Sequence, residues 1–366
     1  MRDMLVDATA TRLFAQELLV RYGADADESE VVTDTLIWSE SRGLGSQGLI
    51  RLPVFIDRMR AGGIISPCHA VFRRLSPVAG ALDGQGGFGQ YLAVEAVRRA
   101  VELARGEGVS IVTVRNSNHF GAAGYYANQA AQAGMIALVT SNAFPVVAAL
   151  GGRKPVLGTN PLAFAAPRSG GESLVIDMGT TFRSRTETVT QLREAGLVAE
   201  GVAVDEDGND VTDICKLEGA ALVPTGQQSF VLGLMVEVLS GILTGAGYSG
   251  QLHSFYRELG QPGNLGHLII CLHVDMFMRR EMFLRRMENL AKLLMSSGDA
   301  DPNQPVRLPG EKRWETHRKY RAAVVIPIKE ETVAVLEELA RPVDLSPSWR
   351  RSSAHPAPRV SRGSTL

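Results

Sequence analysis

Apolar residues in the first sixty positions recur at the spacing of an amphipathic helix. The second of three such segments is expected to be capped by Asp27 or Ser29, and the third to end at Gly62. We therefore expect residues 1–70 to form a helical domain, which helices within 276–325 join. The predicted helices cover residues 8–20, 31–37 and 49–59.

Beyond residue 70 the pattern changes to short apolar runs that alternate with helices. This βαβ-like alternation predicts an α/β domain over residues 71–275, in which the apolar helix 230–243 is core. A closing helix is expected within 326–341, and the Ser/Pro/Arg-rich residues 342–366 are expected to be a disordered tail without a role in the fold. Strands are predicted within 70–83, 111–114, 135–139, 162–165, 173–176 and 267–273, and helices over 88–104, 121–133, 230–243 and 277–295.

Three polar clusters stand next to predicted strands. They are residues 115–119, 140–142 and 158–161. Ligands of α/β proteins bind at strand ends, so these clusters mark a candidate site. His119, in the first cluster, is the one residue among them that exchanges a proton near neutral pH.

Composition narrows the class of protein. Of 366 residues, 45% are apolar and 21% are charged, as in a soluble globular protein. The net charge of -1 gives no footprint for nucleic acid, and no apolar run approaches the ~20 residues of a membrane span. The N-terminus lacks a signal-peptide pattern, and Cys68, Cys215 and Cys271 lack CxxC spacing. We therefore expect a cytoplasmic protein with no structural metal and no nucleic-acid or membrane partner.

Motif spacing alone leaves the chemistry open. The glycine-rich residues 84–89 follow a turn rather than a clear apolar strand, so we discount them as a Rossmann motif. H-E-x-x-H, P-loop and G-x-S-x-G patterns are absent. Spacing therefore predicts an α/β enzyme without specifying its reaction.

Four longer motifs are more specific: NSNHFGAAGYY, GGRKPVLGTNPLAFAAP, VIDMGTT and VEVLSGILTGA. With them the sequence resembles the type 2 malate/L-lactate dehydrogenase family, which includes ureidoglycolate and sulfolactate dehydrogenases and Δ1-piperideine-2-carboxylate reductases. The resemblance implies the malate/L-lactate dehydrogenase type 2 fold, an α/β, non-Rossmann NAD(P)-binding fold with a helical domain beside an α/β domain. It also implies a small-molecule substrate and a homodimer with active sites near the subunit interface. The implied cofactor is NAD or NADP, with NADPH slightly favoured.

The resemblance also suggests catalytic residues. Ser46 and Arg51 match the family's Ser-His-Gly motif and its following arginine, but Gln47 replaces the histidine that is held to donate a proton in imine-reducing members. The acidic residue to which the serine would relay falls on Glu187, in a stretch that departs from the family pattern. His119 is retained, and the ureidoglycolate member is held to use the matching histidine as a base.

Binding residues follow from the same comparison. The lysine of a Gly-Gly-x-Lys-Gly loop is here Gln228. Arg51 is expected to hold a substrate carboxylate, because a guanidinium binds carboxylates best. The implied substrate contacts are Arg51, Thr159 and Asn160, and the implied cofactor contacts are His119, Phe120, Gly121, Asp177, Met178, Gly179, Gly226, Gln227, Gly310 and Glu311.

Two functions remain open at this point. The first is an NAD(P)-dependent oxidoreductase acting on a small 2-oxo acid, 2-hydroxy acid or cyclic 2-imino acid, in a specialised biosynthetic pathway. An imine is preferred, because an iminium arrives protonated and suffers least from the change at Gln47. The second is a cofactor-binding pseudoenzyme, or a repurposed enzyme of ring closure or condensation, since Gln47, Gln228 and the segment around Glu187 all depart from the family. Arg51 could equally be an ordinary charge on a helix surface.

Overall fold

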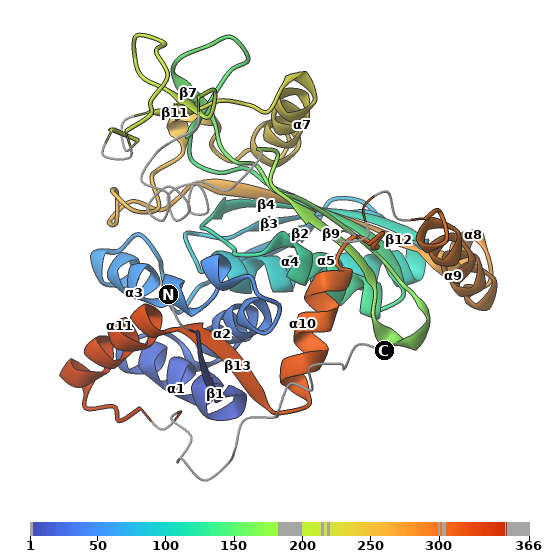
Figure 1. Ribbon diagram of the computed structural model, residues 1–366, viewed down its shortest axis with the longest axis horizontal. Helices are drawn as coiled ribbons and strands as arrows, with labels where there is room; N and C mark the ends of the chain where they lie inside the picture. The colour runs from blue at the N-terminus through green and yellow to red at the C-terminus, as the bar shows by residue number, and fades with distance from the viewer. Residues whose placement is uncertain are drawn as a thin grey trace.

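Seven strands form the main sheet, in the order β2-β3-β4-β12-β5-β8-β9 (Figure 1). The computed structural model describes residues 3–181, 200–213, 216–217, 220–298, 301, 305–347 and 349. The strands are β2 (Val71–Arg74), β3 (Ala79–Asp83), β4 (Val109–Ser117), β5 (Met135–Ser141), β8 (Leu162–Ala166), β9 (Leu174–Met178) and β12 (Leu265–His273). The mixed α/β fold that the resemblance implied is confirmed.

The sheet is mixed: β3, α4 (Gly89–Glu107) and β4 form the predicted βαβ unit with parallel strands, whereas all other neighbouring strands of this sheet are antiparallel. β12 comes late in the chain, yet it lies between β4 and β5 and is antiparallel to both. Hydrophobic periodicity shows which segments are strands but not which strands pair, so this insertion had no signal in the sequence. Because β4 and β5 are both antiparallel to β12, they run in the same direction and their polar ends meet at one edge. β9 runs the same way, since β8 is antiparallel to both β5 and β9.

Two helices cover one face of this sheet. α4 (Gly89–Glu107) buries Leu92, Ala96 and Ala100 at helical spacing, and ends at Gly108 with a φ of 82°. α5 (Ala123–Gln132) buries four alanines and Gly124, small residues that let it approach β5 and β8 closely. Both helices lie between the sheet and the N-terminal helices (Figure 1).

The three predicted N-terminal helices are present as α1 (Ala8–Arg21), α2 (Ala26–Glu40) and α3 (Leu52–Ala61). The predicted caps of α2 are wrong: Asp25 caps it, and its carboxylate accepts from the backbone N–H groups of Asp27 and Glu28. α3 ends at Gly62, as expected. These helices share a core with the predicted closing helix α11 (Glu330–Ala340).

Two short strands, one from each terminal part of the chain, were not predicted from the sequence. β1 (Asp3–Asp7) pairs antiparallel with β13 (Val325–Lys329), directly before α11. α10 (Glu311–Arg321) lies within the range 276–325 in which helices were expected, and the Trp314 ring nitrogen on it donates to the Ser173 carbonyl at 3.0 Å. α10 therefore packs beside β9.

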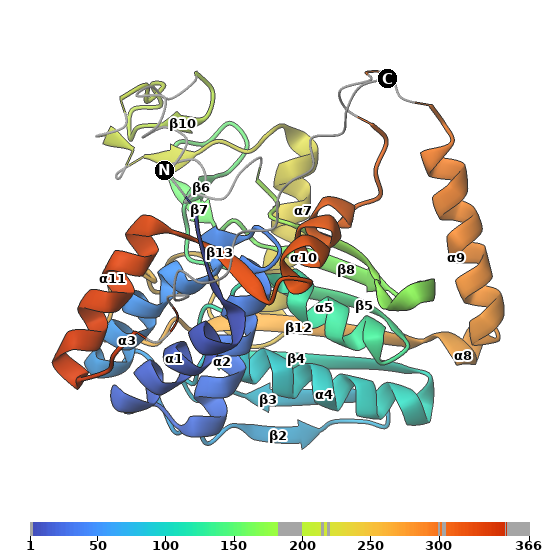
Figure 2. The same cartoon turned by 60° about the horizontal axis from the view of Figure 1, so that its bottom comes forward.

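The helices after β12 are α8 (Val274–Phe277) and α9 (Arg280–Met295), and α9 stands at one side, away from α1–α3 (Figures 1 and 2). It contacts the rest of the chain partly through Arg168, whose Nη2 lies 2.9 Å from Glu288. The predicted division into independent domains stays a prediction. No helix within the described ranges is long and apolar enough to cross a membrane.

A second, smaller sheet lies beside the helix expected to be core. It has the order β10-β11-β6-β7, from β6 (Val147–Ala148), β7 (Pro155–Leu157), β10 (Ala203–Val204) and β11 (Ala221–Leu222). The helix is α7 (Gln227–Glu237), which continues as a π-helix over Val238–Ile242. The prediction of a core stripe is wrong for the single chain: Val231, Leu234 and Ile242 are 52%, 45% and 53% exposed. The high apolar content of a helix indicates that its surface is buried. It does not indicate which part of the chain, or which partner, buries it.

The expectation that the chain beyond Pro342 has no role in the fold is wrong at Trp349. Its side chain is fully buried in the helical core, with its ring centre 4.2 Å from that of Phe14. The Ser/Pro/Arg composition of the tail hid this single large apolar residue. Trp349 therefore ties the C-terminal segment to α1.

We expect Trp349→Ala to lower the free energy of unfolding by about 3–5 kcal/mol, because it opens a cavity in a packed core. Leu13→Ala, a control on the exposed face of α1, should change it by no more than about 0.5 kcal/mol. Urea unfolding followed by circular dichroism measures both. Equal effects of the two variants would contradict this role of Trp349.

Candidate active site

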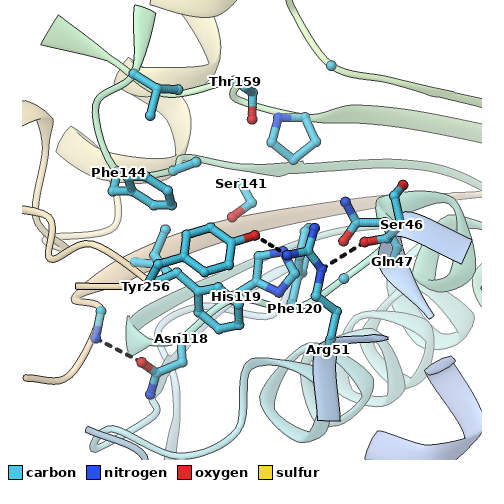
Figure 3. A pocket seen from close by; sticks show the side chains of 18 of the residues that line it. Ser46, Gln47, Arg51, Asn118, His119, Phe120, Ser141, Phe144, Thr159 and Tyr256 are labelled. Carbon is cyan, nitrogen blue, oxygen red and sulfur yellow. Dashed lines mark hydrogen bonds between the residues drawn. The ribbon is translucent and has the colours of Figure 1, made fainter. Parts of the chain in front are cut away.

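A cavity of about 1750 Å³ opens where the polar ends of β4, β5 and β9 meet (Figure 3). Its other walls are the turn 44–51 before α3 and the loop 252–258 before β12. The strand ends named from sequence are therefore brought together, as the candidate site required. The predicted site residues in its wall are Ser46, Gln47, Arg51, His119, Phe120, Gly121, Thr159, Asp177, Met178 and Gly179.

The turn that carries Ser46 and Gln47 rests on a buried carboxyl group. The Glu40 Oε1 accepts from the Leu49 N–H at 2.8 Å. A Cβ at Gly48 would lie 2.2 Å from that oxygen, so only glycine lets the turn pass over Glu40. Burial raises the pKa of Glu40 to about 8. The turn is thus held from beneath by one side chain.

Arg51 lies in the cavity wall and is not an ordinary surface charge. It is 6% exposed, and its Nε donates to the Ser46 carbonyl at 2.7 Å. Its Nη1 donates to the Tyr256 hydroxyl (Figure 3). The neighbouring Gln47 has its Oε1 buried without a hydrogen-bond partner. An arginine and an unsatisfied acceptor therefore line the same part of the wall.

His119 follows β4 and lies among aromatic rings. Its ring centre is 4.7 Å from that of Phe255 and 6.2 Å from that of Phe55, and its Nδ1 is buried without a partner. Burial, together with the nearby cations Arg51 and Arg58, lowers the pKa of His119 to about 3. The imidazole is therefore neutral near pH 7, so it can accept a proton or donate a hydrogen bond.

Asn118 and Arg58 fix the position of His119. The Asn118 Oδ1 accepts from the Gly263 N–H at 2.8 Å and from Arg58 at 3.2 Å, while its Nδ2 donates to the Gly86 carbonyl at 2.8 Å. The Arg58 side chain, 1% exposed, also donates to the Gln261 carbonyl at 2.6 Å. These bonds join α3, the end of β4 and the loop before β12.

His267 on β12 has a structural role beside the same strand ends. Its Nδ1 lies 2.8 Å from the Ser141 hydroxyl, and its Nε2 lies 2.7 Å from the Ser117 hydroxyl. Its ring stacks on Phe120 at 4.5 Å. Burial lowers the pKa of His267 to about 3. A neutral imidazole therefore joins the ends of β4 and β5.

Asp177 faces a second cavity as well as the first. Its carboxylate accepts from the Gly124 N–H, and burial raises its pKa, which Arg313 opposes. The second cavity, of about 250 Å³, shares Asp177 and Arg313 with the first and includes Gly310. Gly310 permits close packing as well, since a Cβ there would lie 2.6 Å from the Val175 carbonyl.

Several predicted residues lie outside both walls. Asn160 is fully buried behind the main wall, where its Nδ2 donates to the Gly233 carbonyl at 3.0 Å and to Glu237 at 2.8 Å. The Glu311 Oε2 accepts from the Leu308 N–H at 3.1 Å. Gly226 and Gln227 begin α7 away from the lining residues, and Glu187 lies outside the described residues.

Sequence reasoning missed much of the wall: Arg58, Phe144, Phe255, Tyr256 and Arg313. Arg313 lies two residues after the predicted cofactor contacts Gly310 and Glu311, so a signal existed there. Phe255 and Tyr256 had none, because the loop before β12 has no periodic pattern.

The donor set fits a nicotinamide dinucleotide. Pockets of about 300–1,000 Å³ hold drug-sized ligands, so this cavity has room for a dinucleotide beside a small acid. A carboxylate such as Asp177 suits ribose hydroxyls, and a cation such as Arg313 suits phosphates. No cluster of three or more His, Cys, Asp or Glu side chains suited to a metal occurs in the described part of the chain.

Comparison with known proteins gives the class first. The matching curated relatives are dehydrogenases, and the chain is an NAD(P)-dependent oxidoreductase of small acids. More narrowly, the model of the family described as malate/L-lactate dehydrogenase matches residues 6–337, so the chain belongs to that family. The resemblance seen in the sequence is thereby confirmed.

Three relatives illustrate the range of the family. A malate dehydrogenase of Pyrococcus abyssi is 33% identical over 90% of this chain and 92% of its own length. A (2R)-3-sulfolactate dehydrogenase (NADP(+)) of Chromohalobacter salexigens is 31% identical over 92% and 97%. A ureidoglycolate dehydrogenase (NAD(+)) of Escherichia coli K12 is 30% identical over 82% and 86%.

Solved structures agree with this assignment. Malate dehydrogenase from Entamoeba histolytica superposes with a TM-score of 0.88 at 28% identity, covering 94% of this chain and 99% of that one. The delta1-piperideine-2-carboxylate reductase of Pseudomonas syringae superposes with a TM-score of 0.83 at 28% identity, covering 92% and 100%.

The pKa of His267 gives a stability test. The pKa is lower in the folded protein than the ordinary value of 6.5, so as pH falls the unfolded chain takes up the proton first. The stability held above pH 6.5 is therefore lost as pH falls, by about 2 kcal/mol at pH 5 for this group. We expect His267→Asn to lose less stability than the wild type between pH 7 and pH 5. Chemical denaturation at both values measures the difference; identical losses would contradict the assignment.

Proposed function

We propose that this protein transfers a hydride between NAD(P)H and a small acid with a 2-oxo or cyclic 2-imino group, or takes it from the matching 2-hydroxy acid. The supporting observation is that Arg51 and His119 line one cavity at the polar strand ends, beside Asp177 and Arg313. The first two suit a 2-substituted carboxylic acid, and the last two suit a dinucleotide.

Arg51 would hold the substrate carboxylate. Its guanidinium is nearly buried and is positioned through the Ser46 carbonyl. A charge-assisted hydrogen bond is about twice as strong as a neutral one, and partial burial strengthens it further. Ser46 would act by fixing this guanidinium through its backbone.

His119 would face the reacting carbon atom. As a neutral imidazole it can accept the proton of a hydroxyl group during oxidation, or polarise a carbonyl during reduction. A carboxylate bound at Arg51 would offset the positive charge that contributes to the low pKa of His119. Substrate binding would therefore make His119 a better base.

Gln47 favours a cyclic 2-imino acid within this class. Its unpartnered Oε1 is a buried acceptor in the cavity wall. An iminium N–H offers the donor that this oxygen lacks. The preference for an imino acid follows because its N–H would give the buried Gln47 Oε1 a hydrogen-bond partner.

The cofactor would lie along the strand ends formed by residues 119–121 and 177–179, with Arg313 near its phosphates. When bound, its nicotinamide supplies or accepts the hydride. The relatives' names carry both NAD(+) and NADP(+). We keep NADPH slightly ahead of NADH, and direct titration with each decides.

Assembly as a homodimer is part of this proposal. α7 and the π-helix after it expose apolar residues that form one surface. Contact between this surface and water costs free energy. A second copy of the chain would bury it. Val231, Leu234, Met235, Val238, Ile242 and Leu243 make up this surface.

Activity tests the proposal directly. Arg51→Gln should raise KM by about 10–100-fold, because it removes one charged hydrogen bond to the carboxylate. His119→Asn should lower kcat by about 10²–10⁴-fold. NAD(P)H oxidation is followed with one 2-oxo acid and one cyclic 2-imino acid. Arg74→Gln, an exposed arginine outside the cavity, is the control. Tight NAD(P)H binding with no oxidation on either substrate would favour the pseudoenzyme or non-redox alternative.

Light scattering tests the dimer. We expect the wild type to be a dimer at micromolar concentration and Leu234→Glu to be a monomer, because a buried, unpaired carboxylate is costly. Leu75→Glu, at a turn of the main sheet and 66% exposed, should leave the dimer intact. A monomeric wild type would refute dimer formation through this surface.

A further inference from the structure

The loop that carries Thr159 is held from behind the cavity wall. Thr159 is the predicted substrate contact on this loop, residues 158–161, and Figure 3 shows it across the cavity from Arg51. The next residue, Asn160, is fully buried and does not line the cavity. Its backbone φ of 34° lies in the left-handed region, which a residue other than glycine adopts at a cost. The side-chain contacts of Asn160 offset this cost and fix the loop.

Both polar atoms of the Asn160 side chain are used. The Oδ1 accepts from the Ala143 N–H at 3.1 Å, and the Nδ2 donates to the Gly233 carbonyl at 3.0 Å and to the Glu237 Oε2 at 2.8 Å. The contact with the carboxylate is charge-assisted, and such bonds are stronger than neutral ones. Because a carboxylate only accepts, the amide nitrogen of Asn160 must face Glu237, and its oxygen is left for Ala143.

Glu237 lies on the inner side of α7 and is 5% exposed. Its Oε1 accepts from the Ser249 N–H at 2.8 Å. Burial raises the pKa of Glu237, and hydrogen bonds from Ser249, Asn160 and Asn142 oppose this shift. All three of these groups are N–H donors, which suits the ionised carboxylate. One buried carboxylate therefore joins α7 to the loop that carries Thr159.

A second segment of the wall, residues 141–145, meets the same network. The buried Asn142 side chain donates to the Gly247 carbonyl at 2.8 Å and accepts from the Gly266 N–H at 2.9 Å. A Cβ at Gly158 would lie 2.2 Å from the carbonyl oxygen of the residue after Asn142, so the two wall segments pack directly against each other. The position of both segments therefore depends on the contacts around Glu237.

We propose that Glu237 is a positioning residue for substrate binding: its carboxylate orients Asn160 and so places Thr159 to bind the substrate acid opposite Arg51. This inference rests on the function proposed above and on the predicted role of Thr159. Thr159 would contact the acid in the ground state and in the transition state alike. Loss of the Glu237 contact should therefore weaken substrate binding and leave the hydride step nearly unchanged.

The first experiment keeps the shape of the side chain and removes one acceptor. In Glu237→Gln the amide oxygen can accept from only one of Asn160 and Ser249, and the amide nitrogen faces the other donor. KM for the substrate acid should rise by about 10–100-fold, and kcat should change by less than about threefold.

Binding without turnover is measured by calorimetric titration. The probe is oxamate if the wild type reduces a 2-oxo acid, and pyrrole-2-carboxylate if it reduces a cyclic 2-imino acid. The Kd of this unreactive analogue should rise in parallel with KM in Glu237→Gln. The Kd of NAD(P)H should change by less than about threefold, because the altered contacts lie behind the substrate side of the wall.

Glu28→Gln is the matched control. Glu28 is also a buried carboxyl group, and its oxygens accept from the Ser66 hydroxyl and the Cys68 N–H, outside the cavity wall. The same substitution there should lower the free energy of unfolding without changing KM. Light scattering should give Glu237→Gln the mass of the wild type, because Glu237 faces away from the exposed apolar residues of α7.

The second experiment tests whether Glu237 acts through Asn160. Asn160→Gly removes the side chain and still permits the positive φ, so it should raise KM by about 10–100-fold on its own. In that background Glu237→Gln should add less than about threefold, because no side chain remains to be oriented. The proposal is overturned if Glu237→Gln leaves KM unchanged, loses kcat instead, or changes the mass. It is also overturned if the two effects on KM multiply, or if Glu28→Gln raises KM equally.

Failure of the proposed function would be seen first. A wild type that oxidises NAD(P)H with neither substrate rejects that function, and this inference with it, before any variant is made. A wild type with normal turnover, together with an unchanged analogue Kd in Glu237→Gln, rejects the inference alone.

Discussion

The buried guanidinium of Arg58 joins the two sides of the cavity. It lies on α3, in the helical part, and donates to Asn118 at the end of β4 and to the loop before β12. Asn118 in turn bonds the Gly86 carbonyl and the Gly263 N–H. Burial of an arginine is costly unless its donors are satisfied; here main-chain carbonyls and Asn118 accept from both Nη groups, while Nε has no partner among the described residues. The shape of the cavity therefore depends on the hydrogen bonds that Arg58 donates.

The same cation shapes the electrostatics of the site. Arg58 and Arg51 both lower the pKa of His119, which burial lowers most. A site that holds two guanidinium groups beside a neutral imidazole favours an anion before any ligand arrives. The substrate carboxylate would thus complete the charge balance of the cavity, and the reactivity of His119 would depend on that binding event.

Much of the fold was accessible from sequence, since helical and strand periodicity located α1–α5 and the main strands. The candidate site was accessible only in part. His119 follows an apolar run, so strand-end logic found it, whereas Ser46, Arg51 and Asp177 came through a resemblance. Tyr256 and Arg58 were not accessible, because their roles depend on which loop crosses the cavity. That depends on β12 lying between β4 and β5, a long-range pairing that no local pattern records.

Glu40 and His267 have a common consequence for kinetic work. Glu40 gives up its proton only around pH 8, and His267 takes one only around pH 3. Between about pH 5 and pH 7 neither group changes its charge. The charges of these two groups beneath the cavity are then constant. A rate profile measured in that range can be interpreted without correction for either of them.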